Sequence, residues 1–78
     1  MNKIRHSEYL YLFGKNLMKL RKLKGLSQTN LAYDANIPVT QIGRIERGEV
    51  NTTISTLFAI SKALNIPVKE LFDFQNTF

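Results

Sequence analysis

The stretch SQTNLAYDANIPVTQIGRIERG, residues 27–48, decides the fold of this 78-residue chain. It predicts two short helices, over residues 28–35 and 39–47, joined by a tight turn. Ser27 is a favourable N-cap, because its hydroxyl can accept a hydrogen bond from an otherwise unpaired backbone N–H. Asn36 suits the left-handed conformation that ends a helix. The stretch therefore predicts a helix-turn-helix.

The second of these helices has two distinct faces when its residues are placed at 100° intervals. Ile42 and Ile45 share a face suited to burial, with Glu46 beside them. The opposite face carries donors and acceptors but no acid: Thr40, Arg44 and Arg47, flanked by Gln41 and Gly43. Arginine binds guanine edges and phosphates, and Gln and Thr reach base edges or the backbone. This face is suited to the major groove of DNA.

Two sets of DNA contacts follow from this arrangement. The predicted base-reading residues are Val39, Thr40, Gln41 and Arg44, with Val39 available for a thymine methyl group. The predicted contacts to the DNA backbone lie at the start of the first helix and after the second: Ser27, Gln28, Arg47, Asn51 and Thr52. Because phosphate contacts release counterions, DNA affinity should fall steeply with salt.

The stretch resembles the helix-turn-helix of the phage-repressor (lambda/434-like, or XRE) family of DNA-binding regulators. The resemblance covers roughly residues 12–72, with Phe13-Gly14 upstream and ISTLFAISKALNIPVKELF downstream. It implies an all-α fold, a compact five-helix bundle with a lambda-repressor-like DNA-binding domain. It also implies an ion pair between Arg21 and Glu46. This pair would tie the first helix of the bundle to the reading helix, which is the second helix of the predicted helix-turn-helix, residues 39–47.

The chain departs from the family pattern at two positions in the turn. Asn36 stands where Gly is common, and Pro38 stands where a capping Ser or Thr is common. Pro38 suits the first turn of a helix, but it removes one potential phosphate contact at the start of the reading helix.

The remaining helices are predicted from their caps and apolar spacing. Residues 7–24 form a first helix capped by Ser7, and residues 54–64 form a fourth helix capped by Thr53. The sequence NIPV then recurs at residues 65–68 and leads into a short fifth helix. We predict one domain over residues 7–78.

A flexible arm over residues 1–6 is predicted to precede this domain. It carries Lys3 and Arg5, which suit a DNA minor groove. His6, the only histidine, has no partner type near it in the sequence, so we expect neither metal binding nor catalysis from it.

The composition argues against several classes of protein. The chain has no Cys, so a disulfide framework and a thiolate metal site are both excluded. It has no apolar run of the ~20 residues that span a bilayer and no signal-peptide pattern, so we expect no membrane partner and a cytoplasmic location. No catalytic constellation, Gly-rich phosphate loop or metal-spaced cluster is present. We therefore expect neither an enzyme nor a cofactor.

The C-terminal segment is predicted to form a dimer interface. Residues 1–48 carry nine Lys and Arg against three acids, for a net charge of +6, whereas residues 49–78 have a net charge of −1. In the resembled family the fifth helix and the residues after it often meet across a two-fold axis. The residues expected to divide between the core and a partner copy are Leu71, Phe72 and Phe74. The alternative is that all three belong to the monomer core.

These features together predict a transcriptional regulator that binds specific double-stranded DNA. It would act as a homodimer on a near-palindromic operator, with reading helices about one DNA turn, ~34 Å, apart. By resemblance, small members of the family are prophage repressors, restriction–modification controllers or antitoxins that repress their own operon. An alternative is an antitoxin-type interaction module that mainly neutralises a partner enzyme. RNA binding is less favoured, because no aromatic stacking platform accompanies the basic face.

Overall fold

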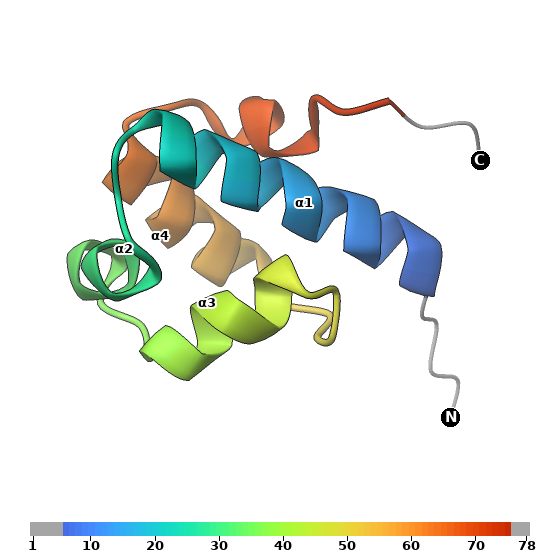
Figure 1. Cartoon of the computed structure of the whole chain (residues 1–78), viewed down its shortest axis with the longest axis horizontal. Coiled ribbons are helices and arrows are strands. Elements are labelled where there is room, and N and C mark those ends of the chain that lie inside the picture. The colour runs from blue at the N-terminus through green and yellow to red at the C-terminus, as the bar shows by residue number, and fades with distance from the viewer. Residues whose placement is uncertain (1–5, 76–78) are drawn as a thin grey trace.

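Four α-helices and a short 3₁₀ helix make up the part of the chain that the structure, a computed structural model, describes, residues 6–75 (Figure 1). They are α1 (Ser7–Leu23), α2 (Gln28–Ala35), α3 (Val39–Glu46), α4 (Ile54–Leu64) and η1 (Val68–Phe72). The all-α, helix-turn-helix prediction is confirmed. The predicted fifth α-helix is wrong, because five residues after Pro67 form only a 3₁₀ turn. Within the described residues, no helix is both long and apolar enough to cross a membrane.

The first helix begins differently from the prediction. Ser7 is the first helical residue rather than the cap; His6 holds the cap position, and no side chain caps this end. At the other end α1 finishes at Leu23, one residue earlier than predicted, and Gly25 follows with φ of 73°. Of the predicted arm over residues 1–6, residues 1–5, with Lys3 and Arg5, lie outside the described residues.

Local capping determines the ends of α2 and α4, as predicted. The Ser27 hydroxyl accepts a hydrogen bond from the Asn30 N–H at 3.0 Å, and the Thr53 hydroxyl accepts one from the Thr56 N–H at 3.1 Å. Both helices end at an asparagine in the left-handed region, with φ of 60° at Asn36 and 58° at Asn65. The repeated NIPV sequence therefore forms the same helix stop twice.

The core lies where the four helices and η1 meet. Every element contributes buried apolar side chains: Phe13 and Leu17 from α1, Leu31, Ala32 and Ala35 from α2, Ile42 and Ile45 from α3, Ile60 and Leu64 from α4, and Leu71 from η1. In Figure 1, α3 lies along one side of α1 and η1 along the other. Helix α3 is thus held by both α1 and α2.

Two glycines allow the backbones of α1 and α3 to touch. A Cβ atom at Gly14 would lie 2.5 Å from the carbonyl oxygen of Ile45 and nearer still to that of Glu46. A Cβ atom at Gly48 would lie 2.8 Å from the Cα of Tyr11, and Gly48 also has a φ of 74°. Real Cβ atoms do not approach other atoms so closely, and side chains disfavour this φ. The placement of α3 against α1 therefore depends on both glycines.

A buried asparagine attaches η1 to the first helix. The Asn16 side chain, which is 5% exposed, donates hydrogen bonds from Nδ2 to the carbonyl oxygens of Glu70 and Leu71, both at 2.9 Å. Both carbonyls lie in the 3₁₀ turn, and that of Glu70 also accepts a hydrogen bond from the Asp73 N–H at 3.2 Å. Asn16 was not singled out from the sequence, since its partners lie more than 50 residues away.

The C-terminal aromatic residues have different environments. Leu71 is fully buried and has no surface to offer a partner. Phe72 is 39% exposed and packs against Phe13 as a tilted ring pair with centroids 4.9 Å apart, whereas the half-buried Phe74 makes a tilted pair with Tyr9 at 5.2 Å. Of the three predicted interface residues, Leu71 thus belongs to the core, and Phe72 and Phe74 lie at its edge.

Candidate nucleic-acid interface

The residues predicted to read bases lie together on the outward side of α3. Val39, Thr40 and Arg44 are exposed, and Gln41 is half-buried. On the opposite side of the helix, Ile42 and Ile45 are almost completely buried. The helix therefore has one face in the core and one that presents hydrogen-bonding groups to solvent, which is the arrangement that direct reading of a major groove requires.

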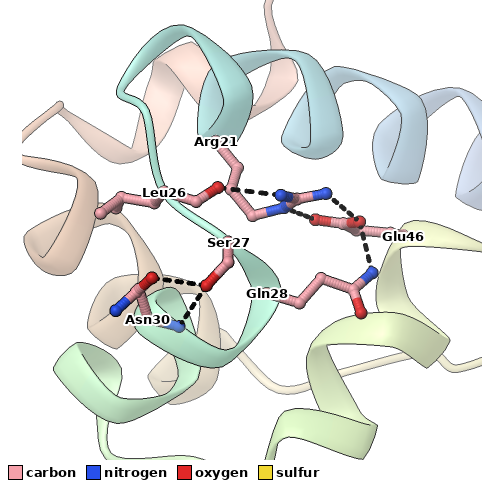
Figure 2. Close-up of polar contacts among 6 residues, drawn as sticks. All are labelled: Arg21, Leu26, Ser27, Gln28, Asn30 and Glu46. Atoms are coloured by element: carbon pink, nitrogen blue, oxygen red, sulfur yellow. Dashed lines mark hydrogen bonds and ion pairs between the residues drawn. The ribbon is translucent and has the colours of Figure 1, made fainter.

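A buried ion pair fixes the position of this helix (Figure 2). Arg21 of α1 donates from Nε to Oε2 of Glu46 at 2.6 Å and from Nη2 to Oε1 at 3.1 Å. The third nitrogen, Nη1, donates to the carbonyl oxygen of Leu26 at 2.9 Å. Both charged side chains are shielded from solvent, with exposures of 9% and 0%. The pair implied by the family resemblance is therefore present, and it ties α1 and the following loop to the end of α3.

Gln28 joins the same network rather than extending freely into solvent. Its Nε2 donates to Oε1 of Glu46 at 2.8 Å, as Figure 2 shows. The glutamate thus accepts hydrogen bonds from both α1 and α2. In this position the side-chain amide of Gln28 helps to hold α3, and the backbone N–H groups at the start of α2 are the donors that remain suited to a phosphate.

The other predicted phosphate contacts have different environments. The Ser27 hydroxyl makes both of its hydrogen bonds within the helix cap: it accepts from the Asn30 N–H and donates to Oδ1 of Asn30 at 2.5 Å. Asn51 is exposed in the loop after α3. The hydroxyl oxygen of Thr52 is buried without a hydrogen-bond partner among the described residues. An inward hydroxyl does not suit the phosphate contact that we predicted for Thr52. Fewer of the predicted residues are therefore placed to contact the DNA backbone than we expected.

An acid, Glu49, lies beside the outward face of α3, on which the helical wheel placed no acid. Glu49 accepts hydrogen bonds from Nε and Nη2 of Arg47 at 2.8 and 3.3 Å, and its Oε1 lies 3.9 Å from Nε of Arg44. The hydrogen bond and the charge of Glu49 both raise the pKa of the Arg47 side chain. The wheel missed Glu49 because the residue follows the helix. The available signal was Gly48, whose left-handed conformation turns the chain back.

Comparison with known proteins finds a helix-turn-helix family profile and two control proteins that match this chain. The profile of the HTH_3 family, described as helix-turn-helix, matches residues 17–71. The control protein C.BamHI of Bacillus amyloliquefaciens is 39% identical over 64 residues, which cover 81% of this chain and 79% of that protein. The control protein C.SmaI of Serratia marcescens is 40% identical over 60 residues, covering 77% and 71%.

A solved structure is similar over almost its whole length. It is the crystal structure of the restriction–modification controller protein C.AhdI from Aeromonas hydrophila, which superimposes with a TM-score of 0.80 at 38% sequence identity. The superposition covers 81% of this chain and 96% of the other.

Proposed function

Because the chain belongs to the HTH_3 helix-turn-helix family of DNA-binding transcriptional regulators, we propose that it is a sequence-specific regulator of restriction–modification genes. The observation that carries this proposal is the outward face of α3. Its side chains are held at a fixed angle by the buried pair between Arg21 and Glu46. The names of the similar control proteins support the choice of regulated genes.

The proposed mechanism is recognition of a near-palindromic operator by a homodimer. Two-fold symmetry places the two reading helices about one DNA turn, ~34 Å, apart. In each half-site, α3 enters the major groove, where Arg44 donates to a guanine and Gln41 and Thr40 contact neighbouring bases. The N-terminus of α2 and the loop at Asn51 contact the phosphates on either side.

The direct test of the function is selection of bound sequences from a random duplex pool. We expect recovery of one near-palindromic sequence, which should also occur upstream of an adjacent methyltransferase or endonuclease gene. Affinity for this duplex should fall about linearly with salt on logarithmic axes, because phosphate contacts release counterions. Recovery of no common sequence, or an affinity independent of salt, would rule out the proposed function. An adjacent toxin gene would instead favour the antitoxin alternative.

Replacing Arg44 with alanine should relax the sequence preference at one base position. A bidentate contact to guanine provides about 1–3 kcal/mol of discrimination, so operator affinity should fall by roughly one to two orders of magnitude. Competition binding against duplexes with each base at each position measures the effect. Equal weakening on operator and random DNA would instead identify Arg44 as a phosphate contact.

The proposed dimer interface comprises apolar surface at the C-terminal side of the domain. Besides Phe72 and Phe74, α4 exposes Ile54 and Phe58, which are 84% and 55% exposed and lie one helical turn apart. Neither residue was among the predicted interface residues. Leu57, between them in α4, lines with Phe72 a shallow pocket of about 170 Å³. Exposed apolar side chains of this kind are suited to contact with a second copy, and Leu71 anchors η1 in the core.

The Phe74→Ser variant should dimerise more weakly than the wild type. Burial of a whole Phe contributes about 1.5–3 kcal/mol, so loss of the part that faces a partner should weaken dimerisation by about one order of magnitude. Sedimentation velocity across a concentration series measures the shift, and circular dichroism confirms the fold. The Tyr33→Ser variant is a matched control, because Tyr33 is 85% exposed on α2. A folded Phe74→Ser protein with unchanged dimerisation would place the interface elsewhere.

A further inference from the structure

Glu49 is held beside the reading helix by the backbone as well as by its side chain. The Gly48 N–H donates to the carbonyl oxygen of Ile45 at 3.0 Å, and the Glu49 N–H donates to that of Arg44 at 2.9 Å. With φ of 74° at Gly48, this pair of bonds is the left-handed turn that commonly closes a helix. The turn directs the residue after it back toward the last turn of α3, so the position of the carboxylate is a built-in feature of the fold.

The carboxylate of Glu49 contacts both arginines of the outward face. It accepts two hydrogen bonds from Arg47, at 2.8 and 3.3 Å, and lies 3.9 Å from Nε of Arg44. The side chains of all three are about half exposed, at 48% for Glu49, 53% for Arg44 and 57% for Arg47. A DNA phosphate therefore has access to the same arginine groups and must compete with Glu49 for them.

The pairing also determines where Arg47 lies in the free protein. Nη1 of Arg47 would be 3.1 Å from a Cβ atom at Gly43, so the guanidinium folds back over the middle of α3. Gly43 is buried although it lies on the outward side of the helix, and the side chains of Arg47 and Gln28 lie over it. Arg47 thus covers part of the reading face when it is paired with Glu49.

We infer that Glu49 is a specificity-determining residue that suppresses binding to non-operator DNA. The inference rests on the proposed DNA-binding function. Attraction to the phosphate backbone supplies essentially all of the affinity for random DNA, and Glu49 opposes it by neutralising two arginines and by repelling phosphates. On the operator, Arg44 contacts a base edge, and Glu49, whose Oε1 lies 3.9 Å from Nε of Arg44, orients that arginine for the contact, which offsets part of the repulsion. The acid therefore weakens random binding by a larger factor than operator binding.

The test compares wild type with E49Q on two duplexes, the one recovered by selection and a scrambled duplex of equal length and composition. We expect E49Q to bind the scrambled duplex about three to ten times more tightly and the selected duplex less than about three times more tightly. The salt slope on the scrambled duplex should steepen by up to about 0.9 for each protomer bound, the equivalent of one further phosphate contact per protomer. Because Glu49 is exposed, the variant should keep the fold, which circular dichroism checks.

The matched control is D73N, which changes the total charge by the same amount. Asp73 is exposed and directly follows η1, which lies on the side of α1 away from α3 (Figure 1). Because Asp73 lies between Phe72 and Phe74 of the proposed dimer interface, sedimentation velocity checks that D73N dimerises as the wild type does. D73N should alter neither the ratio of the two affinities nor the salt slope by more than a small fraction of the E49Q effect. If wild type discriminates between the duplexes but E49Q tightens both equally or neither, the inference is wrong and the proposed function stands. If wild type fails to discriminate, the proposed function is wrong and the inference falls with it.

Discussion

The Gly14→Ala variant should be less stable than the wild type by about 2 kcal/mol, which for a domain of this size lowers Tm by roughly 8–16 °C. The added methyl group would meet the carbonyl oxygens of Ile45 and Glu46, which are backbone atoms and cannot rotate away. Overpacking costs about 1–3 kcal/mol and sometimes more, and the better helix propensity of alanine offsets only about 1 kcal/mol. Because α1 and α3 must move apart as whole helices, we expect the penalty to lie well above that offset.

Thermal and urea unfolding followed by circular dichroism measure this effect, and the chain offers a matched control. Gly43 also lies within a helix, but a Cβ atom there would meet the far end of the flexible Arg47 side chain, at 3.1 Å. Gly43→Ala should therefore leave stability unchanged or raise it by up to about 1 kcal/mol. Similar stability of both variants and the wild type would show that α1 and α3 do not depend on backbone contact at Gly14.

The second large effect concerns the buried ion pair. Arg21→Met should lower the free energy of unfolding by about 3–5 kcal/mol, because it leaves the carboxylate of Glu46 buried without its counter-charge. Glu46→Leu should also destabilise the domain, since it leaves the Arg21 guanidinium with only the Leu26 carbonyl as partner. The double variant should recover most of the loss, because apolar residues of similar volume often replace a buried pair at little or no cost.

Urea denaturation of the two single variants and the double variant forms a complete cycle. We expect strongly non-additive losses, because each single variant strands a charge and the double variant strands none. Glu49→Gln is the control for loss of an ion pair at the surface, and its stability should match that of the wild type within experimental scatter. Additive losses across the cycle would show that Arg21 and Glu46 contribute to stability independently. Single variants that still fold should bind the selected duplex poorly, because α3 loses its tie to α1.

Local interactions explain why so much of the fold was predictable. The caps at Ser27 and Thr53 and the left-handed stops at Asn36 and Asn65 involve residues no more than a few positions apart. The same holds for the two faces of α3, which follow from helical periodicity alone. The family resemblance supplied the ion pair of Arg21 with Glu46, whose members are separated by 25 residues.

The sequence by itself determined the four α-helices, the turn between α2 and α3, and the outward display of Val39, Thr40 and Arg44. Only the tertiary structure decided the contacts between distant segments: Asn16 holding η1, Gly14 admitting α3, and Leu71 filling the core. It also turned the Thr52 hydroxyl inward. The physical reason is that capping and periodicity act within one or two helical turns, whereas these placements depend on which helices come to lie against one another, and a periodic pattern does not contain that information.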